Sequence, residues 1–318
     1  MMRTRILRDA LIAVALVATG AGCGHKVDPK IKEGYDLVIA GKTDQAVALA
    51  NEILGKNPRN APARNIIGLA LYRAGDAEGA VEQYRRALEI NPKYAEAHFN
   101  LGMAYERLSH ASSKDEASAR KYLQDAEASY LAAVRYQKKF VLAHFNLAIL
   151  YSAPGSNRVD QAIAELRQCT KYDPQYAPAF LMLGKLSYGI NDFAGCIASL
   201  GRFLELDPTA KEVRVLLGNA YLQSGKPDAV PRAEESFRAA VGVDSTYVDG
   251  VYSLAVALAT EMKNDEAAVW FRRARTLAEG KPDKAPIVKQ ADAFFARTGL
   301  PASAPASVSA ADSSVAKG

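Results

Sequence analysis

Cysteine and histidine are scarce in this chain, so the few that occur mark where metal or thiol chemistry could take place. The sequence has three cysteines and four histidines. His98 and His144 hold the same place in two similar segments, AEAHFNLGMAY and VLAHFNLAILY. A metal site would need further carboxylate or thiolate ligands at regular spacing, and none recurs beside either histidine. We therefore predict no metal site and interpret both histidines as packing residues.

Motifs for catalysis are absent from the sequence. It contains no Gly-rich phosphate loop after a strand, no HExxH zinc motif and no GxSxG nucleophile motif. Asp and Glu are scattered along amphipathic stretches, which is typical of solvated helix faces. The sequence therefore predicts a protein that is not an enzyme and that binds no cofactor.

The third cysteine, Cys23, follows a segment with the layout of an export signal. Arg3, Arg5 and Arg8 make the N-terminus basic, and residues 10–18 form an apolar run that is too short to span a membrane comfortably. The small residues before Cys23 resemble the processing site of bacterial lipoproteins, although Gly20 stands where that family usually has a branched apolar residue. The resemblance predicts a signal peptide over residues 1–22, a diacylglycerol on the Cys23 thiol and a tether over residues 23–26.

The residue after Cys23 bears on localisation. Gly24 stands there instead of aspartate, which by resemblance to Gram-negative lipoproteins favours the outer membrane, with the protein facing the periplasm. Plain secretion into the periplasm and a retained inner-membrane anchor are the two alternatives.

The rest of the chain is built from a unit of two helices and a turn, seen most clearly in residues 61–94. Gly75 ends the first apolar run, and Asp76 is placed to cap a second one. Asn91 and Pro92 then stop the second helix. Neither helix could bury its apolar stripe alone, so the unit needs copies of itself to stack on.

Copies recur at a period of 34 residues. Pro58 leads to Pro92 and Pro174 to Pro208 by this step. The small residue of the first helix recurs as Gly34, Gly68, Gly102, Gly184 and Gly218. This period resembles that of the tetratricopeptide repeat, or TPR, family. The resemblance predicts an all-α, right-handed superhelical solenoid of about seven repeats over residues 27–281. Extra residues near 109–121, 153–159 and 226–231 are rich in loop-favouring types, and we expect loops there.

In the TPR family the first helices line a concave groove that binds a protein or peptide segment. The residues that correspond to that face, with the adjoining Asn100 and Asn146, are Tyr72, Arg73, Phe99, Asn100, Met103, Arg107, Phe145, Asn146, Ile149, Lys185, Tyr188, Asn219, Gln223 and Tyr252. Their mixture of aromatic, Met and charged residues is typical of a peptide-binding surface. Asn100 and Asn146 resemble the asparagines with which some of these solenoids hold a peptide backbone. The alternative for Phe99, Met103 and Phe145 is that they pack between repeats.

Cys169 and Cys196 lie on the second helices of their repeats, where the family prefers a small residue. We interpret them as small core residues. The alternative is a disulfide bond between neighbouring repeats, which an oxidising periplasm would permit.

Two segments follow the repeats. Residues 282–299 predict an amphipathic helix that caps the stack with Ile287, Ala291, Phe294 and Phe295 on one side. Residues 300–318 are rich in Ala, Ser and Pro and predict a disordered tail.

Composition and charge narrow the function. Lysine and arginine number 40 against 35 acidic residues, without a basic stripe, so we predict no nucleic-acid binding. The predicted function is a membrane-tethered scaffold for protein–protein interactions that assembles a cell-envelope complex, such as a pilus, secretion or outer-membrane machinery. The alternative is a recruiting or regulatory subunit for a periplasmic or peptidoglycan enzyme. The sequence leaves the oligomeric state open.

Overall fold

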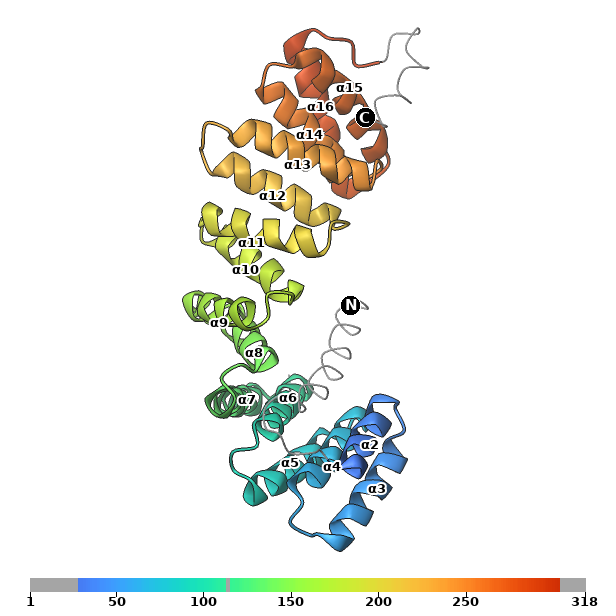
Figure 1. Ribbon diagram of the computed structural model, residues 1–318. Helices are drawn as coiled ribbons and strands as arrows, with labels where there is room; N and C mark the ends of the chain where they lie inside the picture. The colour runs from blue at the N-terminus through green and yellow to red at the C-terminus, as the bar shows by residue number, and fades with distance from the viewer. Residues whose placement is uncertain (1–27, 113–114, 304–318) are drawn as a thin grey trace. The chain divides into compact units, whose positions relative to one another are not determined.

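The computed structural model describes residues 28–112 and 115–303 (Figure 1). The expected signal peptide, Cys23 and the tether lie outside the described residues, as does the tail from residue 304 onward. The part that is described contains α-helices and one short 3₁₀ helix, and no strand. None of its helices is both long and apolar enough to cross a membrane.

The chain divides into two compact units, and the first one extends to Asp173. Its helices are α2 (Pro29–Ile39), α3 (Thr43–Lys56), α4 (Ala61–Ala74), α5 (Ala77–Ile90), α6 (Ala95–Ala111), α7 (Glu116–Tyr136), α8 (Val141–Tyr151) and α9 (Val159–Tyr172).

The second unit begins at Pro174. Its elements are α10 (Ala177–Gly189), α11 (Phe193–Leu206), α12 (Lys211–Gln223), α13 (Ala229–Val243), α14 (Val248–Thr260), α15 (Asn264–Ala278), η2 (Pro282–Lys284) and α16 (Ala285–Thr298).

Each unit is a stack of helix pairs (Figure 1). Consecutive helices pack together, as α4 does with α5 and α12 with α13, and each pair then packs on the next through contacts such as α5 with α6 and α13 with α14. First helices of neighbouring pairs also touch, as α2 does with α4 and α12 with α14. The prediction of an all-α repeat fold is therefore confirmed.

Local signals set the helix ends of the repeat unit. The Asn60 side chain accepts a hydrogen bond from the Ala63 amide at 2.9 Å and caps α4. Gly75 ends that helix with φ 98°, a left-handed conformation that glycine adopts without steric cost. The Asp76 carboxylate then accepts from the Gly79 amide at 2.8 Å and caps α5.

Small residues bring the two helices of a pair close together. A Cβ atom at Gly68 would lie 2.5 Å from the Tyr84 ring, and one at Gly102 would lie 2.5 Å from the Tyr130 ring. No side chain fits in that space without displacing the aromatic ring. The recurring glycines are therefore packing requirements of the pair.

The expectation of a loop over residues 109–121 is wrong for most of that segment. The insertion lengthens both helices of the third pair, so that α6 continues to Ala111 and α7 begins at Glu116. Asp115 starts α7 by accepting from the amides of Ala117 and Ser118, and alanine-rich sequence continues the helix. Polar composition had favoured a loop, but helix capping and alanine content decided the structure.

The last helix, α16, covers the end of the second unit. Its buried side chains are Ile287, Ala291, Phe294 and Phe295, the four residues assigned to its apolar side. They pack in a cluster that includes Phe271 and Ala274 of α15. The helix ends at Gly299, which has φ 69°.

Candidate peptide-binding surface

The first helix of each pair carries the residues assigned to a groove, and we call this side of the stack the first-helix face. In the first unit, most of these residues are buried by packing between helices. Five of the side chains assigned to a groove are buried, namely Tyr72, Phe99, Asn100, Met103 and Phe145. Phe99 lies against Tyr130 and Phe140, with ring centroids 5.7 and 4.9 Å away. A ligand lying on this face would not touch these five side chains in this conformation. Ile149, in contrast, is exposed.

The two asparagines expected to hold a peptide backbone are hydrogen-bonded inside the protein. Asn100 Nδ2 donates to Asn65 Oδ1 at 3.0 Å, and Asn65 Nδ2 donates to the Tyr35 hydroxyl at 3.1 Å. This series of hydrogen bonds ends at Tyr94, whose hydroxyl lies 2.7 Å from that of Tyr35. These bonds link α2, α4 and α6 and satisfy buried polar groups.

Asn146 makes a similar contact one repeat further along. Its Nδ2 donates to the Tyr130 hydroxyl at 3.1 Å, and that hydroxyl donates to the Glu106 carboxylate. Burial raises the pKa of Tyr130 well above its ordinary value, so the hydroxyl keeps its proton at any physiological pH. The amide of Asn146 is thus already bonded to the helix pair beside it.

Two arginines of the same face also serve the stack. Arg73 Nη1 donates to the Ile39 carbonyl at 3.4 Å, in the last turn of α2. The Arg107 guanidinium lies 3.8 Å from the centroid of the Tyr72 ring and donates to the Tyr72 carbonyl near the end of α4. A cation at the C-terminal end of a helix is stabilised by the unpaired carbonyls there.

The corresponding face of the second unit keeps its polar groups available. Lys185 of α10 and Gln223 of α12 are exposed, and Asn219 of α12 is half-buried. None of the three side chains forms a hydrogen bond or ion pair within residues 28–112 and 115–303. Tyr188 is half-buried and meets Phe193 edge-on, with centroids 5.7 Å apart.

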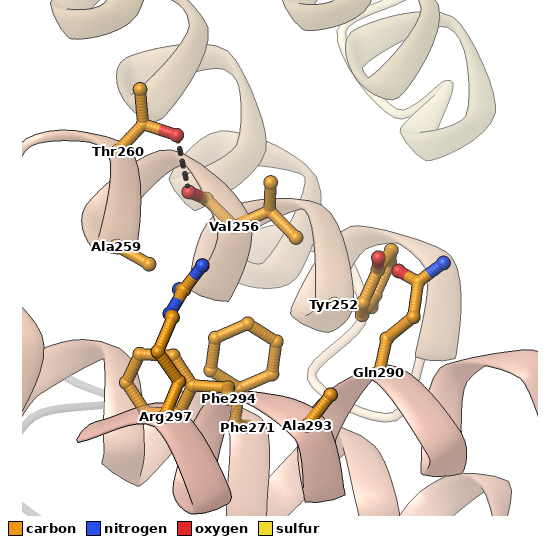
Figure 2. A pocket seen from close by; sticks show the side chains of 9 residues that line it. All are labelled: Tyr252, Val256, Ala259, Thr260, Phe271, Gln290, Ala293, Phe294 and Arg297. Carbon is orange, nitrogen blue, oxygen red and sulfur yellow. Dashed lines mark hydrogen bonds between the residues drawn. The ribbon is translucent and has the colours of Figure 1, made fainter.

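A pocket of about 470 Å³ adjoins this face where α14 meets α15 and α16 (Figure 2). The side chains that line it are Tyr252, Val256, Ala259, Thr260, Phe271, Gln290, Ala293, Phe294 and Arg297. Stacked rings of Phe271 and Phe294, 4.4 Å apart, form an aromatic base. Tyr252 meets Phe271 edge-on at 6.2 Å, and burial raises the pKa of Tyr252.

Polar groups surround this aromatic base. Figure 2 shows the Arg297 guanidinium on the side of Ala259, and Tyr252 beside Gln290 at the other side. Thr260 Oγ1 donates to the Val256 carbonyl at 2.9 Å. The side chains of Arg297 and Gln290 are exposed and have no hydrogen bond or ion pair to any other described residue. Arg297 is the one charged residue among the nine that line the pocket.

Comparison with known proteins identifies the architecture. Residues 68–109 match the family model described as TPR repeat. The C-terminal part of a TPR repeat-containing protein from Cytophaga hutchinsonii is 13% identical, with a TM-score of 0.61 over 81% of this chain and 99% of that one. The chain has the TPR fold.

Two further solved structures belong to TPR proteins. YrrB, described as a TPR protein with an unusual peptide-binding site, is 14% identical and has a TM-score of 0.50, with 64% of this chain and 96% of that one covered. A thermophilic TPR protein from Thermus thermophilus is 22% identical, with a TM-score of 0.46 over 61% of this chain and 97% of that one. Comparison with curated protein sequences gives no match.

The two histidines have local partners in the TPR stack. His98 Nε2 lies 2.9 Å from the Pro92 carbonyl, and its ring stacks on Tyr136 with centroids 5.4 Å apart. His144 Nδ1 lies 2.5 Å from Glu165 Oε2, and its Nε2 lies 2.9 Å from the Lys138 carbonyl. Within residues 28–112 and 115–303, no three His, Cys, Asp or Glu side chains are grouped so as to hold a metal ion.

Cys169 and Cys196 are buried free thiols, with no bond between them. They lie in different units, on α9 and α11, at positions where the TPR helix takes a small residue. Burial raises the pKa of Cys169 to about 12 and that of Cys196 to about 11, which keeps both thiols protonated and unreactive. Cys169 Sγ also donates to the Val141 carbonyl at 3.4 Å.

Sequence reasoning found Tyr252 but missed Gln290, Ala293 and Arg297, which lie on the other wall of the pocket. The sequence of residues 282–299 predicts a cap whose apolar side packs on the stack, and it gives the polar side no partner. The spacing held a signal, because residues 290, 293 and 297 recur at intervals of three and four and so share one helix face with Phe294.

Proposed function

We propose that this chain is a scaffold that binds segments of other proteins on the first-helix face of its second unit. Lys185, Asn219 and Gln223 make the polar contacts to the bound segment. The observation that carries the proposal is that these side chains have no partner within the described residues, whereas Arg73, Asn100 and Asn146 on the first-helix face of the first unit are hydrogen-bonded. The surface offers binding groups and no nucleophile or metal ligands, which suits recognition of a partner.

The proposal includes a membrane tether. Acyl chains on Cys23 would hold the protein at the periplasmic face of the outer membrane, with each buried methylene contributing about 0.8 kcal/mol. The basic and apolar leader before Cys23 supports this part. A tethered scaffold raises the local concentration of its partner at the membrane. We infer a role in assembling a cell-envelope complex, such as a pilus, secretion or outer-membrane machinery.

In-cell cross-linking of the full-length protein tests the binding surface. The variant Lys185→Ala, Asn219→Ala, Gln223→Ala should lose a small set of cross-linked envelope proteins that the wild type retains. A matched control, Lys226→Ala with Glu235→Ala, changes exposed residues elsewhere in the second unit and should retain the set. Capture of the same proteins by all three forms would reject this surface.

The tether is tested separately. Cells fed a radiolabelled fatty acid should label the wild type and not Cys23→Ser, and the variant should leave the membrane fraction. Equal labelling of both forms, or an unlabelled wild type, would reject lipidation of Cys23 while leaving the binding surface untouched.

A further inference from the structure

We propose that the pocket between α14 and α16 takes a large apolar side chain of an extended partner segment, and that Arg297 binds an Asp or Glu two residues away in that segment. The inference rests on the proposed function, since it names the chemistry of a partner that the same face would bind. It adds an anchor that the residues Lys185, Asn219 and Gln223 do not provide.

The apolar part of the pocket fits one large side chain. Its base is the stacked pair Phe271 and Phe294, and Val256, Ala259 and Ala293 add aliphatic surface around it. A volume of about 470 Å³ lies within the range of pockets that hold small organic groups. An aromatic or long aliphatic side chain would gain contact with the exposed parts of these groups and lose its own contact with water.

Charge complementarity assigns the second part of the ligand. Arg297 carries the one charge of the pocket wall and has no carboxylate partner among the described residues. The two acids beside the pocket-lining residues have other partners, because Asp292 pairs with Arg275 at 3.1 Å and Glu261 pairs with Lys263 at 2.5 Å, a lysine that Glu234 shares. The open cation therefore favours an anionic group, and a planar guanidinium is suited to a carboxylate.

The spacing along α16 fixes how far apart the two ligand groups lie. Ala293 and Arg297 are four residues apart on the helix, which is about 6 Å along its axis. In an extended peptide, side chains two residues apart share a face and lie about 7 Å from each other. An apolar residue in the pocket thus places the side chain two positions away beside Arg297. Gln290 and the Tyr252 hydroxyl remain to bond the peptide backbone.

The test selects random seven-residue peptides that bind the purified full chain. The peptides are displayed inside a carrier protein, so that none has a free terminus. The wild type should enrich an aromatic or long aliphatic residue two positions from Asp or Glu. Ala293→Glu should lose these peptides, because its carboxylate fills the pocket and pairs with Arg297 four residues later. Ala293→Gln, the uncharged match, keeps Arg297 free and should retain part of the binding.

Affinity then separates the two groups. A synthetic peptide from the selection should bind at least tenfold more weakly to Arg297→Gln, and its own Asp→Asn or Glu→Gln version should be weakened equally. When Arg297→Gln is combined with the changed peptide, binding should be no weaker than with either change alone, as expected when the two groups contact each other. Ala293 and Arg297 are exposed, and neither side chain has a polar partner among the described residues, so thermal melting should show all variants folded.

Several outcomes would overturn the inference. Peptides that bind Ala293→Glu and Arg297→Gln unchanged, yet fail on the Lys185, Asn219, Gln223 alanine variant, reject the pocket and leave the proposed function standing. A peptide that needs only a free terminal carboxylate rejects the internal acid. Enrichment of no peptide above that on the empty support rejects both proposals.

Discussion

The Tyr84 and Tyr130 rings occupy the same place in successive TPR helix pairs, but of the two hydroxyls only that of Tyr130 has hydrogen-bond partners within residues 28–112 and 115–303. Each ring covers a glycine of the preceding helix, Gly68 or Gly102. The Tyr130 hydroxyl bonds Glu106 and Asn146, whereas the fully buried Tyr84 hydroxyl has no hydrogen-bond partner among the described residues. In the second unit Phe237 fills the same place against Gly218 and Leu200 fills it against Gly184, so the position takes a large apolar side chain and needs no hydroxyl.

This difference predicts opposite effects of the same substitution. Tyr84→Phe removes an unpaired buried hydroxyl and should leave stability unchanged or raise it by up to about 1 kcal/mol. Tyr130→Phe takes a partner from two polar side chains and should lower stability by about 1–3 kcal/mol. Urea denaturation of both variants in one buffer measures the two effects, and equal losses would contradict the assignment of partners.

Replacing Met262 by glycine should stabilise the protein, because the backbone of Met262 is in the left-handed conformation. Met262 has φ 61° and is 80% exposed, in the turn after α14. Gly41 and Gly225 hold the equivalent turn place after α2 and α12, with φ 74° and 63°. Met262→Gly should relieve the left-handed strain and raise stability by about 1 kcal/mol in thermal unfolding. A lower melting temperature would mean that the Met262 side chain makes a contact that outweighs the strain.

The Glu234 carboxylate should contribute to stability in a pH-dependent way. Burial opposes its ionisation, but hydrogen bonds from Lys263 and Arg238 outweigh burial and lower its pKa from 4.5 to about 2. A depressed pKa stabilises the folded state above the unfolded-state pKa, and this stability is lost as pH falls through the folded-state value. The wild type should therefore exceed Glu234→Gln in stability at pH 6, and the difference should shrink between about pH 4.5 and pH 2. A difference that stayed constant over that range would show that the ion pairs add nothing.

The sequence predicted the TPR helix pairs well because their boundaries depend on local chemistry. Gly75 and Asp76 act within a turn of their own position, so their effect can be inferred without knowing the neighbours. The exposure of the first-helix face depends on which helices stack beside it. Position alone therefore could not show that Asn100 bonds Asn65 or that Lys185 stays free.

The same limit explains why the pocket was missed. Its two walls come from α14 and α16, which are separated by the whole of α15. Periodicity identified the buried side of α16, including Phe294, because a single helix carries that pattern. Which exposed residues would face Tyr252 is set by the packing of α16, and the sequence pattern does not contain that orientation.

Helix glycines provide a final, internally controlled prediction. A Cβ atom at Gly102 would lie 2.5 Å from the Tyr130 ring, whereas one at Gly201, within α11, would meet no described atom within 4 Å beyond its chain neighbours and its own helix backbone. Gly102→Ala should therefore destabilise the protein by about 1–3 kcal/mol through overpacking. Gly201→Ala should stabilise it by about 0.5–1 kcal/mol, because alanine favours the helix and nothing obstructs the added methyl group. Urea denaturation of both variants measures the pair. A loss of stability in both would mean that α11 packs more tightly than its contacts indicate, and a gain in both would mean that the Tyr130 ring moves aside without cost.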